Sequence, residues 1–124
     1  MKITTFNPQI ITKNAEPLVK LFEELGFEKK HNKEDIGEKN VRGIQMEDAN
    51  GFKLDISEFD SPAPQDLVSI RINVDDFDEA YQMLIAKGFK NFYGDKLAET
   101  PTSKSAVLFS PSGFSINLVK HIKS

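Results

Sequence analysis

The chain has 124 residues, of which 39% are hydrophobic and 28% are charged, as expected for one globular domain of ordinary size. Sixteen basic and nineteen acidic residues are interspersed and give a net charge of −3, which argues against a nucleic-acid partner, and the absence of cysteine excludes disulfides and thiolate metal sites. No segment approaches the roughly 20 apolar residues of a membrane span and the first residues lack a signal-peptide pattern, so we expect a cytoplasmic protein without a membrane partner.

Residues 3–12 open the chain with a β-branched and apolar run that predicts a strand, in which Pro8 indicates an edge position or a bulge. An amphipathic helix is predicted next, because apolar residues recur at helical spacing at Leu18, Leu21, Phe22 and Leu25. Asn14 is expected to cap the start of this helix and Gly26 to end it.

Three short strands are predicted after this helix, at 27–31, 41–47 and 52–59. Residues 32–40 are almost wholly polar, which predicts a mobile surface loop that is either a plain hairpin loop or a lid over a site. The loop-forming residues around 61–66 are expected to connect this half of the chain to the next.

The second half repeats the plan of the first. A strand is predicted from the alternating apolar residues Val68, Ile70, Ile72 and Val74. Asp76 is then expected to cap a helix that ends at Gly88 and whose apolar stripe comprises Phe77, Ala80, Met83 and Leu84. Three strands follow at 89–93, 104–110 and 114–121.

Landmark residues of the two halves recur at a constant offset of 62 positions without a gap. The clearest pairs are Gly26 and Gly88, Phe27 and Phe89, Gly51 and Gly113, and Phe52 and Phe114. A repeat of this length indicates a duplicated half-domain. We therefore predict one α+β domain over 1–124, built of two tandem βαβββ modules at 1–60 and 67–124 with a linker at 61–66.

Strand alternation divides each predicted sheet into a face that packs on the helix and a second, mostly polar face. The helix-packing set is expected to include Phe52, Val68 and Phe114. The candidate site residues on the polar face are Asn7, Gln9, Glu47, Asp55, Ser69, Arg71 and Asn117. In the simpler alternative this polar face is exposed to water. In the other, the two half-sheets form one curled mixed sheet, and its concave cleft encloses the polar face.

Arg71 is the distinctive residue of this polar face. Its planar guanidinium suits a carboxylate or a phosphate, and the alternative is an internal salt bridge to Asp55 or Glu47. Four aromatic residues, expected near the rim of the cleft, are suited to stacking on a planar ligand or to packing in the core or in a dimer: Phe59, Phe92, Tyr93 and Phe109.

The closing segments of the halves, Gly51 to Ile56 and Pro111 to Leu118, together with the duplicated βαβββ pattern, resemble the vicinal oxygen chelate superfamily. This superfamily includes glyoxalase I, bleomycin-resistance proteins, fosfomycin-resistance enzymes and extradiol dioxygenases. The resemblance covers essentially the whole chain and implies a glyoxalase/bleomycin resistance-like fold and a homodimer. It does not by itself imply a reaction.

Metal-dependent members of this superfamily take ligands from the first and last strands of each half. By resemblance these positions fall on Asn7, Asp55, Ser69 and Asn117, of which Asp55 is the only good ligand. We therefore predict no tightly bound metal and no other cofactor. The two histidines, His31 and His121, are expected to be solvated surface residues.

The function that we favour from sequence is metal-free binding of a small polar or anionic molecule, with Arg71 pairing its charge. The alternative is a lyase, isomerase or dioxygenase-type enzyme that uses Asp55 and Glu47 as acid and base. Such an enzyme would work with or without a weakly held divalent metal such as Mg²⁺ or Mn²⁺.

Overall fold

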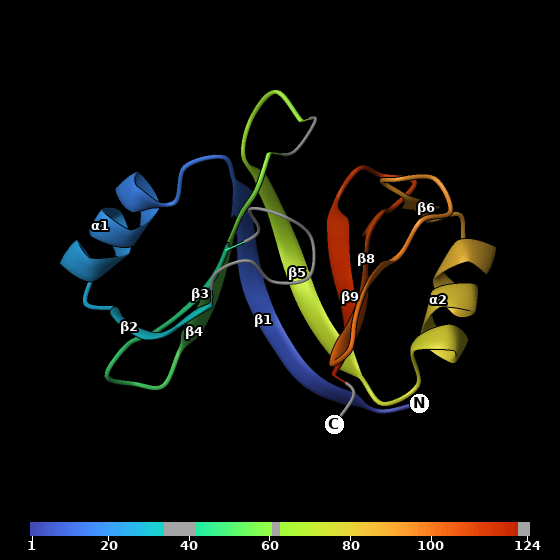
Figure 1. Ribbon diagram of the computed structural model, residues 1–124, viewed down its shortest axis with the longest axis horizontal. Helices are drawn as coiled ribbons and strands as arrows, with labels where there is room; N and C mark the ends of the chain where they lie inside the picture. Colours follow the sequence, from blue (N-terminus) through green and yellow to red (C-terminus); the bar gives the residue numbers. More distant parts are fainter. Residues whose placement is uncertain (34–41, 61–62, 122–124) are drawn as a thin grey trace. The chain divides into compact units, whose positions relative to one another are not determined.

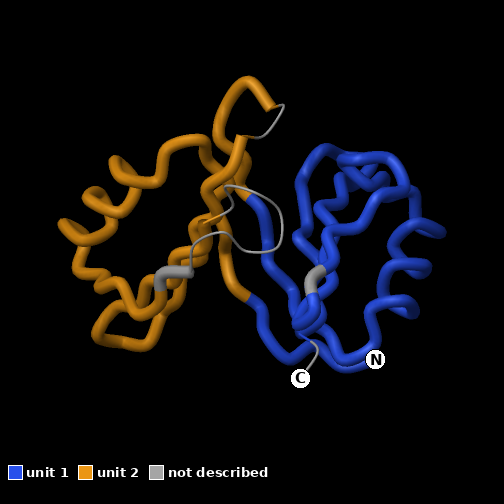
Figure 2. The backbone as a smooth tube through the Cα atoms, in the orientation of Figure 1, with its two compact units in different colours: residues 1–6, 69–124 blue, residues 7–68 orange. Residues whose placement is uncertain are grey.

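A computed structural model describes residues 1–33, 42–60 and 63–121 and divides the chain into two compact units (Figures 1 and 2). The N-terminal unit comprises Asn7–Val68, and the C-terminal unit comprises Met1–Phe6 together with Ser69–Ser124. The first residues of the chain belong to the C-terminal unit because they bond to it. The Lys2 backbone N–H donates to Asp75 Oδ1 at 2.6 Å, and the Asp75 N–H donates to the Lys2 carbonyl at 3.1 Å.

The N-terminal unit contains one helix on one face of its strands (Figure 1). Its elements are β1 (Ile3–Thr12, which begins in the other unit), α1 (Glu16–Glu24), β2 (Glu28–Lys33), β3 (Arg42–Glu47) and β4 (Lys53–Glu58). The strand order is β2-β3-β4-β1, with β1 and β4 parallel and the other pairs antiparallel. The predicted strand, helix and three strands are confirmed.

The end of one strand in this half differs from the prediction. Strand β2 extends into the stretch predicted to be a loop, because Asn32 and Lys33 pair with Ile44 and Gly43 of β3. The rest of that predicted loop, residues 34–40, lies outside the described residues.

The C-terminal unit repeats this arrangement (Figure 1). Its elements are β5 (Leu67–Val74, which begins in the other unit), α2 (Phe77–Ala86), β6 (Lys90–Asn91), β7 (Ala98–Thr100), β8 (Ser103–Phe109) and β9 (Ser115–His121). The strand order is β5-β9-β8-β6, with β5 and β9 parallel and β7 paired to β8.

The strand predicted at 89–93 is the one that departs most from expectation. It shrinks to two residues because Asn91 starts a turn: its Oδ1 accepts from the Tyr93 N–H at 2.9 Å, and its carbonyl accepts from the Gly94 N–H at 3.1 Å. Gly94 has a φ of 77°, which favours glycine. Strand β7 was not predicted and pairs with the start of β8.

The offset of 62 residues is reproduced in the strand register. Gln9 pairs with Asp55 where the repeat pairs Arg71 with Asn117, and the antiparallel pair of Gln45 with Asp55 is repeated by Val107 with Asn117. The turn glycines repeat too, since Gly26 and Gly88 have φ values of 105° and 97°. The predicted duplication of a βαβββ module is confirmed.

Each unit has its own hydrophobic core between the helix and one face of the strands. In the N-terminal unit the buried residues are Ala15, Val19, Ile44, Met46, Leu54 and Ile56. In the C-terminal unit they are Val74, Phe77, Ala80, Ala106, Leu108, Ile116 and Leu118. None of the helices in the described part of the chain is both long and apolar enough to cross a membrane.

Six residues assigned to helix-packing positions from sequence are instead exposed, and two of them, Leu21 and Leu25 of the first predicted helix stripe, are 47% and 63% exposed. Phe52 and Phe114 precede the first residues of β4 and β9, and 66% and 50% of their surfaces are accessible. Val68 lies near the start of β5 and is 74% exposed, and Met83 on α2 is 43% exposed. Alternation therefore fails at the strand ends, where the helix no longer covers the sheet.

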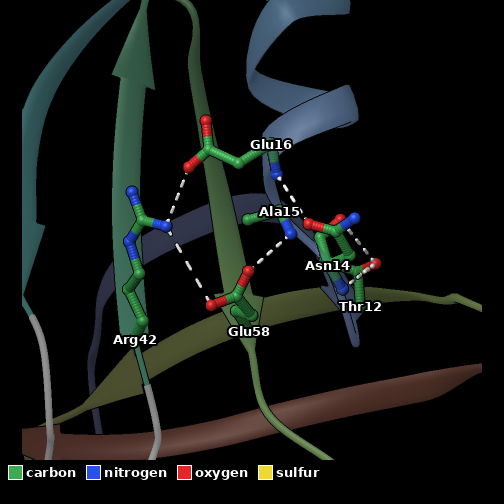
Figure 3. A network of polar contacts seen from close by, with 6 residues as sticks. All are labelled: Thr12, Asn14, Ala15, Glu16, Arg42 and Glu58. Carbon is green, nitrogen blue, oxygen red and sulfur yellow. Dashed lines mark hydrogen bonds and ion pairs between the residues drawn. The ribbon is translucent and has the colours of Figure 1, made fainter.

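The start of α1 also differs from the prediction (Figure 3). The N-cap residue is Ala15 rather than Asn14, and its backbone N–H donates to Glu58 Oε2 of β4 at 2.6 Å. Asn14 instead accepts from the Glu16 N–H at 3.4 Å through Oδ1. Arg42 Nη1 lies 3.0 Å from Glu16 Oε1 and 4.0 Å from Glu58 Oε1, so it holds the capping carboxylate in place.

The start of α2 follows the prediction. Asp76 is the N-cap, and its Oδ1 accepts from the Glu79 backbone N–H at 3.1 Å. A side-chain oxygen at this position satisfies one of the donors that the first turn of a helix leaves without an intrahelical partner.

Candidate functional site

The polar face of the N-terminal unit is linked by hydrogen bonds between its own side chains. Asn7 Nδ2 donates to Asp55 Oδ2 at 3.1 Å, and Gln9 Nε2 donates to Ser57 Oγ at 2.7 Å. Asn7, Gln9 and Asp55 are all buried. The parallel register of β1 and β4 thus brings three predicted site residues together, with the two amides donating to acceptors within the unit.

Glu47 lies on the same face as Asp55, on the neighbouring strand. Gln45 pairs with Asp55, and Glu47 follows two residues later on β3, where it is half-buried and pairs with Lys53. A step of two residues returns a side chain to the same face of a strand. The two carboxylates proposed for acid–base chemistry therefore share a face.

The polar face of the C-terminal unit is built on alternate residues of β5: Ser69, Arg71 and Asn73. Ser69 Oγ and Asn73 Oδ1 are buried and have no hydrogen-bond partner among the described residues. A buried polar atom that lacks a partner costs about 1–3 kcal/mol, so such atoms are uncommon. The repeat of Asn73 in the other unit is Ile11, an apolar residue.

Arg71 lies in the middle of this row and is half-buried. It pairs with Asn117 in the parallel register of β5 and β9. Its Nη2 is 3.2 Å from His121 Nε2, at the end of β9. The C-terminal unit therefore brings together three of the predicted site residues, Ser69, Arg71 and Asn117.

His121 is a residue of this face that the sequence prediction missed. It is exposed, as expected for a surface histidine, but it contacts Arg71. The alternation of β9 contained the signal, because Asn117, Val119 and His121 follow one another at steps of two and therefore share a face. Its position near the end of the chain had suggested only a solvated side chain.

The predicted aromatic residues separate into two groups. Phe92 contacts both Tyr93 and Phe109, with ring centroids 5.1 and 4.9 Å apart. Phe109 pairs with Ser115, which in turn pairs with Ser69, so this aromatic cluster adjoins the polar face of the C-terminal unit. Burial raises the pKa of the Tyr93 hydroxyl, which is therefore neutral near pH 7. Phe59 belongs to the other unit.

A depression of about 180 Å³ lies in the N-terminal unit, lined by residues 11–14 and 63–66. It is smaller than the roughly 300–1,000 Å³ typical of ligand pockets. None of the predicted site residues lines it.

The donor chemistry of these faces does not fit a transition metal. Of the four positions that the family resemblance marks as ligands, only Asp55 offers a carboxylate, and its Oδ2 accepts from Asn7. Among the residues that the structure describes, no three His, Cys, Asp or Glu side chains lie close enough to hold a metal ion together. One carboxylate with two amides and a hydroxyl is a poor set for such an ion.

No family model matches the sequence, and no curated protein matches it. Solved structures do match. Glyoxalase I from Zea mays superposes with a TM-score of 0.66 at 15% identity over 98% of this chain and 44% of the maize chain. This chain thus spans less than half of the length of the maize enzyme.

Two further structures match over most of both chains. Methylmalonyl-CoA epimerase from Mycobacterium tuberculosis gives a TM-score of 0.64 at 15% identity, over 95% of this chain and 88% of its own. A glyoxalase/bleomycin resistance protein/dioxygenase superfamily member from Vibrio splendidus gives 0.61 at 15% identity, over 96% and 99%. At these identities the similarity concerns the fold.

Proposed function

The chain has the fold of the vicinal oxygen chelate superfamily, an α+β fold of paired βαβββ modules, and on this premise we propose that it binds a small polar or anionic molecule. Arg71 pairs with the negative charge of the ligand. Ser69 and Asn117, which flank it on β5 and β9, supply hydrogen bonds. The aromatic cluster of Phe92, Tyr93 and Phe109 contacts an apolar part of the ligand.

One observation carries this proposal: the polar face of the C-terminal unit holds a cation beside buried polar atoms that have no partner among the described residues. Arg71 stands between Ser69 and Asn73 on β5, and neither Ser69 Oγ nor Asn73 Oδ1 has a partner among the described residues. A ligand that brings its own hydrogen-bonding groups would satisfy these atoms. These atoms are already desolvated in the free protein, so ligand binding would not have to remove water from them.

The N-terminal unit contributes less in this proposal. Its candidates Asn7, Gln9 and Asp55 already form hydrogen bonds with one another or with Ser57. They and Glu47 remain predicted ligand-binding residues, but a ligand must displace these internal bonds to reach them. Because the four marked positions make a poor ligand set, binding without a metal is the preferred form of the proposal.

The test is ligand-dependent thermal unfolding of the wild-type chain and of an Arg71→Met variant. Benzoate offers an anion and a ring, and benzamide is its neutral analogue. We expect benzoate to raise the unfolding midpoint of the wild type, because a ligand that binds only the folded state stabilises it. Benzamide should have a much smaller effect.

Lys120→Met is the matched control for this test. It removes one positive charge from the same strand as Asn117, but from the face that alternation turns towards α2. The control should respond to benzoate like the wild type, whereas Arg71→Met should not respond. An equal response from Arg71→Met would contradict the proposal.

We also propose that the chain forms a homodimer, by resemblance, and that it acts in the cytoplasm. The solution mass from light scattering after size-exclusion chromatography tests the first point. A mass near twice 14.0 kDa is expected, and a mass of 14.0 kDa at every concentration would contradict it.

A further inference from the structure

The character of the contact between Arg71 and His121 depends on the protonation of the histidine. A guanidinium has only donors, so Arg71 Nη2 must donate across the 3.2 Å contact and His121 Nε2 must accept. A neutral ring that carries its proton on Nδ1 can accept this hydrogen bond. If Nε2 is protonated, two N–H donors and two positive charges face each other, and the contact becomes repulsive.

Among the described residues, Arg71 is a charged side chain in contact with His121. Strand β8 presents Ser103, which pairs with His121 and has no charge. Asn73 of β5 pairs with Val119 of β9, and Asp75 and His121 each follow two residues later. Asp75 therefore lies at the same end of this face as His121. The Lys2 N–H donates to the Asp75 carboxylate and holds the pKa of that group below its ordinary value.

We propose that His121 is a specificity-determining residue of the anion site, which it shares with Arg71. Together they form a two-armed site for a doubly charged oxyanion of the phosphate or sulfate type. Arg71 is charged at every physiological pH, whereas His121 becomes the second cationic arm only when it is protonated. This inference rests on the proposed function and names the ligand class of the same site.

The pH dependence follows from this arrangement. The Arg71 guanidinium lies next to His121 in the protein without ligand. A bound dianion accepts hydrogen bonds from both side chains and favours the protonated ring. By linkage, affinity for a dianion must rise as the pH falls through the titration of His121 and level off below it. A monoanion gains less, because one charge is shared between two cations.

The experiment is a titration with sulfate that is monitored by NMR, at constant ionic strength and at several pH values between 8 and 5.5. Sulfate keeps its two charges throughout this range, so any change in affinity arises from the protein. We expect the affinity for sulfate to rise about tenfold as the pH falls over this range. A gain of this size follows when bound ligand makes one histidine easier to protonate. Methyl sulfate carries a single charge, so the logarithm of its affinity should rise by at most about half as much as that of sulfate.

Two variants separate His121 from other groups that titrate in this range. His121→Gln retains an acceptor for Arg71 but has no second charge, so its affinity for sulfate should be independent of pH. His31→Gln is the matched control, because His31 is the other histidine of the chain and lies in the N-terminal unit. The Met1 amino group, 3.5 Å from Glu79, is present in both variants.

The outcomes distinguish this inference from the proposed function. If the wild type binds sulfate through Arg71 but without any pH dependence, or if His121→Gln keeps the wild-type slope, the role of His121 is overturned and the anion site stands. If the wild type binds neither sulfate nor benzoate at any pH, both proposals fail. In addition, Arg71→Met should raise the pH midpoint of the His121 ring resonances and leave those of His31 in place.

Discussion

The two units share a strand register and a core layout but differ on the face turned away from the helix. At equivalent positions the N-terminal unit has Gln9 and Ile11 where the C-terminal unit has Arg71 and Asn73. Gln9 donates to Ser57 within its own unit, whereas Asn73 Oδ1 has no partner in the described part of the chain. The two copies thus share their packing, and the buried side-chain atoms without a partner among the described residues lie on the C-terminal copy.

The starts of the two helices also compare directly. Arg42 and Glu16 form an ion pair at 3.0 Å, and the repeat forms the equivalent pair at 3.0 Å between Lys104 and Asp78. Lys104 lies in addition 5.1 Å from the centre of the Phe77 ring. The surface pair is thus retained in both copies, while the cap of the helix is supplied in two different ways.

The largest expected effect is on the cores. Met46 and Leu108 are equivalent in the repeat, and both have no exposed surface. Met46→Ala and Leu108→Ala should each lower the free energy of unfolding by about 3 kcal/mol, since each leaves a cavity in a packed core. Urea unfolding measures the loss. Hydrogen exchange should show the first opening in the altered unit, and equal exchange throughout both units would contradict two separate cores.

An exchange of residues between the polar faces is the next test. Ile11→Asn buries a polar group at a site that is 2% exposed and should cost about 2–3 kcal/mol. The reciprocal Asn73→Ile removes the buried acceptor that lacks a partner and should stabilise the free protein by about 1 kcal/mol. Denaturant unfolding of the two variants measures both. A destabilised Asn73→Ile would show that Asn73 Oδ1 is satisfied in the protein.

The helix caps should give smaller losses, each confined to one unit. Asp76→Ala should cost about 1 kcal/mol and fray α2, because it removes the oxygen that accepts from Glu79. Glu58→Ala should cost a similar amount, about 1–2 kcal/mol, and fray α1, whose Ala15 N–H loses its acceptor. Amide exchange in the first turn of each helix is the readout. Fraying of α2 in Glu58→Ala would contradict this assignment.

The smallest effect concerns the attachment of the first residues of the chain. The pKa of Asp75 is lowered because the Lys2 N–H donates to its carboxylate, so its contribution to stability is present above the ordinary aspartate value of about 3.9. That contribution is lost as the pH falls through the lower value in the folded protein. Asp75→Asn should therefore remove part of the acid dependence of unfolding, and an unchanged dependence below pH 4 would argue against this contact.

Most of the fold was predictable because periodicity and duplication reinforce each other. Two glycine turns at the same offset, together with alternating strands, predicted both modules, and Asp76 was recognised because a helix cap lies next to its helix in sequence. The cap of α1 was not recognised, because Ala15 and the Glu58 carboxylate that accepts from it are 43 residues apart in sequence. The early end of β6 was not predicted, because Asn91 and Gly94 form a turn inside a run whose alternation alone indicates a strand.

The candidate site was predictable in part. The polar face was recognised from alternation, and the structure brings its members together within each unit. The roles of the individual side chains were not predictable, because hydrogen bonds between strands decide which groups are already satisfied. The contact of Arg71 with His121 joins residues 50 apart, so nothing in the local sequence marks it.

The most direct test of a binding face on the C-terminal unit is to map where an anionic ligand binds, using backbone amide and side-chain NMR shifts during a titration with benzoate. We predict that the perturbed residues gather around Arg71 and Asn117 on β5 and β9, and that Gln9 and Asp55 on β1 and β4 keep their shifts. Perturbation of Gln9 and Asp55 without Arg71, or no perturbation of either face, would contradict the assignment of ligand binding to the C-terminal unit.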